Sequence, residues 1–337
     1  MLAVAGFALS ACSPAYVARA VYEEAWILLR RQPIEKVLAE DRLTPAERTR
    51  LELVLDARRF AADQVGLEVD GAYSTLSRAN SGAVVYVLTA AERDRLESYK
   101  WWFPIVGRVP YKGFFSKAKA EAAAADLEKQ GYDTYVRPSV AFSTLGWFDD
   151  PLLSSLLKLD TVTLLNVVIH ELFHNTVFLA GEITFDESAA NFVGSRGVVD
   201  FFCDGPRERF RWCAEATAEW RDAVSVSRFL DEELDRLREF YEDARGDPEL
   251  LGMRGRAFAA IRRRFRALPL ESHRYDDFLD EPINNASLLH DRVYYRDLEV
   301  FDELYRRRGG LRRAVDALKT IDEEGSDRPF ERLHEMA

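Results

Sequence analysis

The sequence predicts an α+β fold that is mainly helical, with a small β-sheet lobe beside a helical lobe and one buried helix at the centre. Three observations support this prediction. Residues 162–173 are apolar nearly all round a helix, and the chain beyond residue 198 has helical periodicity to its end. Residues 72–143 are instead rich in β-branched and aromatic side chains interrupted by prolines, which is typical of short strands.

Length and composition set the limits of this fold. The chain has 337 residues, of which 47% are hydrophobic, enough for one domain with two lobes or for two domains. We expect N-terminal helices and the α+β lobe in 13–150, and the central and C-terminal helices in 151–337. Beyond residue 12 no segment approaches 18 uninterrupted apolar residues, so we expect no transmembrane helix. The net charge of −11 argues against a nucleic-acid partner, which needs a basic face.

Residues 1–12 are expected to be a lipoprotein signal peptide. The apolar run ends in Leu9-Ser10-Ala11 before Cys12, which resembles a bacterial lipobox, where lipid chains are attached to the cysteine. The run is too short to span a bilayer. No Lys or Arg precedes Cys12, so the usual positive region is missing from this segment, and a short buried helix with an ordinary cysteine is the alternative. A lipid on Cys12 would anchor the protein to a membrane of the bacterial cell envelope, facing the periplasm.

The region 13–150 is expected to begin with helices and to continue as the sheet lobe. Within 13–66, Thr44 is a helix cap, Pro45 follows in the first turn and Glu47 completes a capping box. Further elements expected are strands at 83–88, 132–138 and 140–144, strands broken by prolines within 99–113, and a helix at 116–130 ended by Gly131.

The central helix carries an HExxH sequence, with Asp160 and Thr161 as candidate caps at its start. His170 and His174 are four residues apart, so on a helix they lie on one face with Cβ atoms roughly 5–6 Å apart. Two imidazoles in this arrangement can bind one Zn²⁺ ion. Glu171 lies beside the ion rather than on it, where its carboxylate can take a proton from water.

A catalytic zinc site normally has three protein ligands, so a third must come from elsewhere. We expect the central helix to end at Gly181 and a second helix to begin at Ile183. Glu187 of that helix is the candidate for the third ligand. The alternative is structural, because Thr184-x-x-Glu187 also reads as a capping box. The nearby HExxH makes the ligand the favoured interpretation.

These motifs resemble the bacterial putative aminopeptidase family of zinc-dependent lipoproteins, whose members pair HEL-x-H with a later F-N-E-S-F-A. Residues 185–190 read F-D-E-S-A-A here, so Asp186 and Ala189 depart from the pattern while the glutamate is kept. The resemblance implies a zincin-like fold of the gluzincin type, with one Zn²⁺ per chain on His170, His174 and Glu187, and a peptide substrate. It extends to residues 59–61, 103–107, 111–115, 141–151 and 283–286.

The C-terminal region supplies two further candidates. Residues 208–245 and 248–268 predict a long antiparallel helical pair whose charged faces point to solvent. After it, Tyr294 is the candidate donor that stabilises the negative oxygen formed during hydrolysis, with Tyr295, His290 or a purely structural tyrosine as alternatives. His273 and His334 are expected on the surface.

The cysteines predict one disulfide. Of the three in the chain, Cys12 is assigned to the lipid, which leaves Cys203 and Cys213 in the segment FFCDGPRERFRWC. An even remainder in an exported protein favours a Cys203–Cys213 bond that closes a short loop. Two buried free thiols are the alternative.

The function expected is hydrolysis of peptide bonds, with Glu171 passing the proton of water to the leaving amine. An aminopeptidase also needs a carboxylate for the substrate's free amine, and the sequence does not rank Glu182, Asp186, Asp149 and Asp150. Action as a metalloendopeptidase, or on a bond other than a peptide bond, therefore stays open. The rival from another class is a non-catalytic envelope lipoprotein stabilised by zinc. Glu171 argues against it, because a structural site has no use for that carboxylate.

Overall fold

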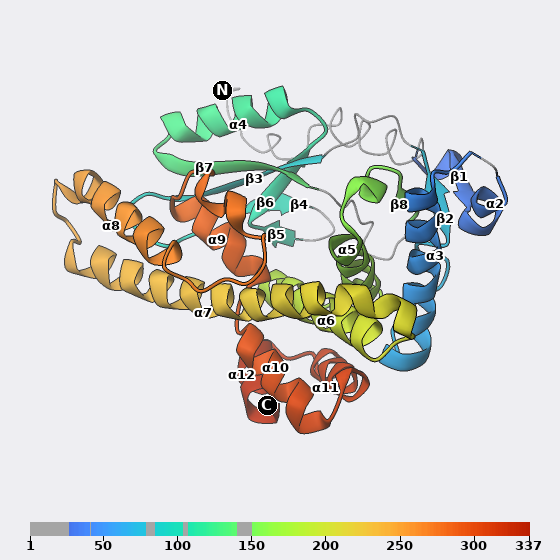
Figure 1. Ribbon diagram of the computed structural model, residues 1–337. Coiled ribbons are helices and arrows are strands. Elements are labelled where there is room, and N and C mark those ends of the chain that lie inside the picture. The colour runs from blue at the N-terminus through green and yellow to red at the C-terminus, as the bar shows by residue number, and fades with distance from the viewer. Residues whose placement is uncertain (1–26, 41, 79–84, 104–106, 140–149) are drawn as a thin grey trace, which may run out of the picture.

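Helices predominate in the residues that the computed structural model describes, which are 27–40, 42–78, 85–103, 107–139 and 150–337 (Figure 1). The mainly helical α+β prediction is confirmed at this level. The helices are α2 (Ile34–Leu38), α3 (Pro45–Phe60), α4 (Lys117–Lys129), α5 (Thr161–His174), α6 (Ile183–Cys203), α7 (Cys213–Asp243), α8 (Leu250–Phe265), α9 (Asn285–Tyr294), α10 (Leu298–Arg308), α11 (Leu311–Glu323) and α12 (Pro329–Met336). A π-helical turn, η1 (Ala61–Val65), and three 3₁₀ turns, η2 (Leu156–Lys158), η3 (Arg207–Trp212) and η4 (Asp276–Leu279), complete them.

The strands form small sheets. They are β1 (Arg31–Pro33), β2 (Thr75–Ser77), β3 (Val85–Glu92), β4 (Trp101–Phe103), β5 (Gly107–Val109), β6 (Tyr111–Phe114), β7 (Tyr132–Ser139) and β8 (Leu152–Leu153). One sheet has the order β6-β3-β7 and is antiparallel throughout. In a second sheet β2 pairs antiparallel with β1 and parallel with β8, and β4 with β5 forms a hairpin.

The β6-β3-β7 sheet presents one face to α9. Thr89 of β3 lies opposite Tyr111 of β6 and Tyr135 of β7, so these side chains share a face. Thr89 Oγ1 is 3.1 Å from Nδ1 of His290 in α9, which places α9 over this face. Leu88 and Ala90 point the other way and pack with Ala124 and Leu127 of α4. The sheet is thus enclosed between α4 and α9 (Figure 1).

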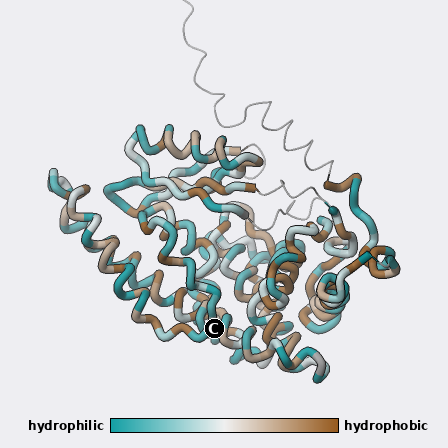
Figure 2. Tube along the Cα trace, turned by 45° about the horizontal axis from the view of Figure 1, so that its top comes forward, coloured by the Kyte–Doolittle hydropathy of each residue, from teal (hydrophilic) through white to brown (hydrophobic). Residues whose placement is uncertain are grey.

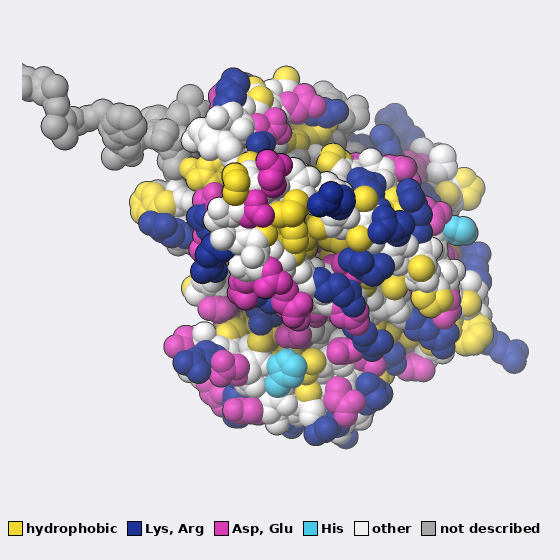
Figure 3. Space-filling view, turned by 90° about the vertical axis from the view of Figure 1, so that its left-hand side faces the viewer, with side chains coloured by type: hydrophobic (Ala, Val, Ile, Leu, Met, Phe, Trp, Pro, Cys, Tyr) yellow, Lys and Arg dark blue, Asp and Glu magenta, His cyan; other side chains and the backbone are white. Residues whose placement is uncertain are grey.

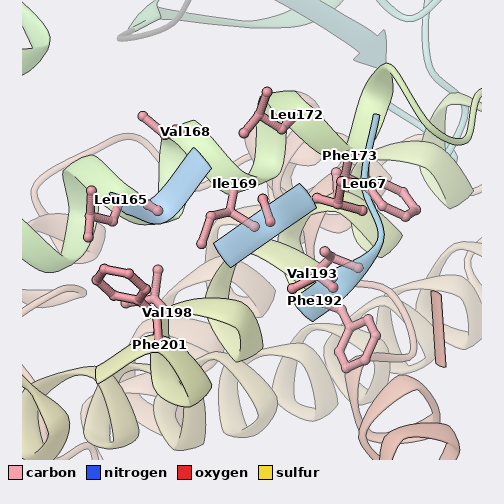
Figure 4. Packing of buried hydrophobic residues seen from close by; sticks show 14 of the residues in the cluster. Leu67, Leu165, Val168, Ile169, Leu172, Phe173, Phe192, Val193, Val198 and Phe201 are labelled. Carbon is pink, nitrogen blue, oxygen red and sulfur yellow. The ribbon is translucent and has the colours of Figure 1, made fainter. Parts of the chain in front are cut away.

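The largest hydrophobic cluster surrounds α5 and α6 and includes side chains from α3, α10, α11 and α12. In Figure 4, Leu165 and Ile169 of α5 lie opposite Val193, Val198 and Phe201 of α6. Members of this cluster come from both sides of residue 150. A second cluster joins α7 to α8, and a third lies between the sheet and α4.

The central helix begins where the sequence predicts and ends earlier. The side chain of Asp160 accepts a hydrogen bond of 2.8 Å from the backbone N–H of Thr163, as an N-cap does. The helix ends at His174, with Asn175 as its C-cap. The prediction that Gly181 ends this helix is therefore wrong. Gly181, at φ +95°, lies in the turn before α6, where a positive φ favours glycine.

Most other predicted elements are present. α3 begins with the capping box of Thr44 and Glu47, and α4 is followed by Gly131 at φ +95°. The prediction that 13–66 is helical is wrong at β1, which pairs with β2. The first long helix of the C-terminal pair begins at Cys213 rather than at 208, because a 3₁₀ turn precedes it. Cys12, residues 1–26 and the strand expected at 140–144 lie outside the described residues.

A disulfide joins Cys203, the last residue of α6, to Cys213, the first residue of α7. The bond closes the short loop that contains η3. The predicted Cys203–Cys213 bond is therefore present in the structure, and the alternative of two free thiols is wrong.

The outer surface is polar and mixed in charge. In Figure 2 the outer helices alternate between hydrophilic and hydrophobic residues along their length, which is the pattern of amphipathic helices. On the face seen in Figure 3, Lys and Arg side chains are interspersed with Asp and Glu. His273 and His334 are exposed, as predicted, although each lies near an aspartate. Within the described ranges, no helix combines the length and the apolar character needed to cross a membrane.

Candidate metal centre

The last turns of α5 bring two imidazoles together. Nε2 of His170 and Nε2 of His174 are 3.3 Å apart, and the two ring centroids are 5.0 Å apart. His174 is buried, while the side chain of His170 is 13% exposed. Both Nε2 atoms therefore point to one small space at the end of a rigid, buried helix.

Glu187 of α6 completes the group. Its Oε2 lies 3.2 Å from His170 Nε2 and 3.6 Å from His174 Nε2. The capping-box alternative for Glu187 is wrong, because α6 begins at Ile183 with Glu182 as the N-cap, and no side chain caps it. Thr184 is already inside the helix, so the Glu187 carboxylate is free to point at the histidines.

The three donor atoms fit a zinc ion by distance and by type. Around a tetrahedral ion with ligands at about 2.0–2.1 Å, neighbouring ligand atoms are about 3.3–3.4 Å apart. The donor atoms of His170, His174 and Glu187 are separated by 3.2, 3.3 and 3.6 Å. Two imidazoles and one carboxylate form a donor set of catalytic zinc sites, which leave a fourth position open.

Electrostatics favour a cation in this space. Burial alone would raise the pKa of Glu187, but the charges and hydrogen bonds of His174 and His170 hold it well below its usual range. Burial would lower the pKa of His174, yet the Glu187 carboxylate and the nearby charge of Glu171 raise it to about 9. The Glu187 carboxylate therefore stays negatively charged and favours a positive charge on or between the histidines, from protons or from a metal ion.

Glu171 directly follows His170 in α5. Its negative charge contributes to raising the pKa of His174 and of three buried tyrosines. These tyrosines are Tyr73, Tyr111 and Tyr294. The carboxylate that follows the first histidine in sequence thus acts electrostatically on His174, one of the three candidate ligands.

Tyr294, the last residue of α9, lies close to the candidate metal centre. Its ring centroid is 6.4 Å from that of His170. Burial and the charge of Glu187 raise its pKa well above 10, so the hydroxyl stays protonated and can donate. Of the alternatives, His290 contacts Thr89 through Nδ1, while among the described residues its buried Nε2 has no hydrogen-bond partner. The ring of Tyr295 packs against Tyr275.

Two tyrosines of the site were missed by the sequence reasoning. Tyr111 belongs to β6, and Tyr73 lies in a turn with the left-handed φ of +56°. Burial is the main cause that raises the pKa of each, followed by Glu187 for Tyr111 and Glu171 for Tyr73. Tyr111 lies in the 111–115 segment that resembles the family, but that resemblance gave it no role, and Tyr73 belongs to no motif singled out in the sequence. Only the folded structure, in which both tyrosines are buried and feel the charges of Glu171 or Glu187, identifies them.

A family comparison covers this whole arrangement. Residues 15–333 match the family model described as putative aminopeptidase. The chain belongs to this family. A search of curated proteins and a search of solved structures each found no significant match. Because the matched range includes α5, α6 and α9, membership of the putative aminopeptidase family assigns a peptidase function, at a coarse level, to the part of the chain that holds the candidate metal centre.

An aminopeptidase must also hold the free amine of its substrate, and one of the four candidate carboxylates, that of Asp186, has another task. Oδ1 of Asp186 accepts a hydrogen bond of 3.0 Å from the backbone N–H of Leu179, and Asp186 is only 2% exposed. Asp186 therefore stabilises the turn between α5 and α6. Asp150 is buried, and its backbone oxygen accepts from the N–H of Tyr73. Glu182 is partly exposed at the start of α6, and Asp149 lies outside the described residues.

Proposed function

We propose that this protein is a zinc-dependent aminopeptidase with a zincin-like fold of the gluzincin type. The observation that carries the proposal is the triangle of donor atoms from His170, His174 and Glu187. Glu171, which follows His170 in α5, acts electrostatically on His174. The family supports hydrolysis of peptide bonds. The three ligands would hold the ion, and Glu171 would remain free for chemistry.

In the proposed reaction, bound zinc supplies a Lewis acid that polarises the scissile carbonyl and acidifies water. Glu171 takes a proton from the attacking water and then donates it to the nitrogen of the leaving amine. The protonated hydroxyl of Tyr294 donates a hydrogen bond to the carbonyl oxygen as negative charge builds on it. These roles separate binding of the ion from transfer of the proton.

We also propose that lipid on Cys12 anchors the protein to the bacterial cell envelope, facing the periplasm. The lipobox pattern ending at Cys12 supports this location. The Cys203–Cys213 disulfide supports it independently, since disulfides persist in oxidising compartments. Metabolic labelling with an alkyne fatty acid tests the anchor. Wild type should be labelled and Cys12→Ala should not, and equal labelling of both would remove the proposal.

The first experiment compares purified wild type with Glu171→Gln, measuring metal content by mass spectrometry and cleavage of a mixed peptide library. We expect one zinc per chain in both proteins and a cleavage rate about 10²–10⁴-fold lower in the variant, because only proton transfer is lost. Glu121→Gln on the exposed face of α4 is the matched control and should cleave normally.

The other outcomes separate the alternatives. Release of single N-terminal residues supports an aminopeptidase, whereas internal cuts would support a metalloendopeptidase. Zinc without cleavage in either protein would favour a zinc-stabilised lipoprotein without catalysis. A wild-type protein that binds no metal would contradict the proposal at its base.

A further inference from the structure

Arg137 is a cationic side chain next to the candidate metal centre, and no carboxylate in the described part of the chain forms an ion pair with it. It lies in β7, two residues after Tyr135, so its side chain is on the sheet face that α9 covers. Among the described residues it makes no ion pair, and its Nε is enclosed without a hydrogen-bond partner. By contrast, Asp133 on the same face is paired with Arg254 and Arg93.

An enclosed donor of a charged group that makes no hydrogen bond is costly, so it calls for a partner that the described residues do not supply. Asp291 is the carboxylate whose pKa responds to Arg137. Burial raises the pKa of Asp291 to about 7 and Arg137 lowers it, but the two do not form an ion pair. Ion pairing with the residues that the structure describes therefore does not account for the guanidinium of Arg137.

The position of Arg137 connects it to the metal centre. Its guanidinium carbon is 5.6 Å from the ring centroid of Tyr294, and that centroid is 6.4 Å from the ring of His170. Arg137 and His170 thus lie within about 12 Å of each other, a span that about three residues of extended peptide cover. Tyr111, on the same sheet face, lies near Glu187 and Glu171.

We propose that Arg137 binds a carboxylate of the peptide substrate, within about three residues of the scissile bond. This inference rests on the proposed peptidase function. The planar guanidinium matches a carboxylate through two parallel hydrogen bonds, which makes arginine suited to selecting one. In a peptide the carboxylate is either the free C-terminus of a short chain or the side chain of an acidic residue. Arg137 would therefore favour short or acidic peptides.

Binding of uncleaved peptides tests this proposal without relying on activity. Trialanine and trialanine amide are titrated by calorimetry into full-chain protein carrying Glu171→Gln. We expect the free acid to bind about tenfold or more tightly than the amide, as a charge-assisted hydrogen bond allows. Adding Arg137→Gln should remove this preference, and Arg137→Lys should keep only part of it. A tripeptide amide ending in Glu, compared with one ending in Gln, shows whether a side-chain carboxylate serves equally.

Arg256→Gln is the matched control, because it removes the same charge from the exposed surface of α8 and should leave the preference intact. Equal binding of acid and amide, no measurable binding of the acid, or a preference that survives Arg137→Gln would each overturn the proposal. Because the selectivity of the Glu171→Gln protein with Arg137 intact is itself a result, misfolding of one Arg137 variant does not remove the test. If the protein is not a peptidase, this is recognised separately, because wild type and Glu171→Gln are compared for zinc content and for cleavage of the peptide library.

Discussion

At the scale of single residues, the candidate metal centre depends on how closely α6 approaches α5. A Cβ atom on Gly194 would lie 2.8 Å from Oδ1 and 2.9 Å from the backbone oxygen of Asn166, and 3.2 Å from Cβ of His170. Asn166 cannot easily move away, because its Nδ2 donates to Oγ of Ser195 at 2.8 Å. Glycine at position 194 is therefore a steric requirement for bringing Glu187 to the histidines.

We expect Gly194→Ala to push the two helices apart. The variant should lose about 1–3 kcal/mol of unfolding free energy through overpacking and should bind zinc more weakly. Urea denaturation and competition with a chelator measure the two effects. Gly255→Ala in α8 is the control, since nothing lies within 4 Å of its Cβ, and it should stabilise the protein by about 0.5–1 kcal/mol. Unchanged zinc affinity in Gly194→Ala would show that the approach of the helices does not set the site.

The sequence predicted those site residues whose spacing along the chain already places them on one helix or on the next one. His170, Glu171 and His174 are fixed by the four-residue period of a helix, and Glu187 follows on the next helix. Arg137 could not be found in this way. It reaches the site because β7 pairs with β3 and α9 covers their common face, and no local pattern encodes that pairing.

At the scale of elements, the start of α5 meets α7 through an acidic cluster. Carboxylate oxygens of Asp160, Glu215 and Glu219 lie within 4.8 Å of one another. Burial raises the pKa of Glu219 from its ordinary value of 4.5 to about 7, although Arg274, 3.1 Å away, lowers it. The folded protein therefore binds a proton at Glu219 more tightly than the unfolded chain does.

This shift predicts a pH-dependent effect of Glu219→Gln. The pKa of Glu219 is higher in the folded than in the unfolded protein. Its contribution to the free energy of unfolding is therefore fully present below pH 4.5 and is lost as the pH rises through about 7. The variant, which mimics the protonated form, should exceed wild type by roughly 1–3 kcal/mol at pH 8 and match it near pH 4. Chemical denaturation at both pH values measures this. Glu121→Gln should show no such dependence, and a variant less stable than wild type at pH 8 would refute the assignment.

Elements were predictable where their signal lies within one segment. The capping box at Thr44 and the cap at Asp160 each identify a helix start through side chains a few residues apart. The strands β1, β2 and β8 have only two or three residues, too few to show an alternating pattern. They exist because distant segments pair, and pairing of that kind is not visible in local periodicity.

At the scale of the whole molecule, the proposed site combines residues from two parts of the fold, and the positions of these parts relative to each other must be fixed. The metal ligands lie on α5 and α6, whereas Tyr111 and Arg137 lie on the sheet and Tyr294 on α9. These parts belong to different hydrophobic clusters, since the sheet packs mainly with α4 and the metal helices pack with α3 and the C-terminal helices. Polar contacts at the start of α9 connect the sheet to the helices.

Asp133 of β7 is the centre of these contacts. It pairs with the buried Arg254 of α8, and its Oδ2 accepts a hydrogen bond of 3.1 Å from the backbone N–H of Asn285, the first residue of α9. Asn284, the cap of α9, donates through Nδ2 to the backbone oxygen of Thr134 at 3.0 Å. One carboxylate therefore fixes both α8 and α9 to the sheet.

We expect Asp133→Ala to loosen the sheet from the helices without destroying the proposed metal centre. Breaking the buried pair leaves Arg254 uncompensated, which should cost about 3–5 kcal/mol of unfolding free energy. Zinc stoichiometry should remain at one per chain, because α5 and α6 do not depend on Asp133, while KM for peptides should rise as Arg137 and Tyr294 lose their register. Asp126→Ala, which removes a carboxylate from an exposed pair on α4, should change none of these quantities. Loss of zinc from Asp133→Ala, or an unchanged KM for peptides, would contradict the prediction that the sheet positions the substrate without contributing to zinc binding.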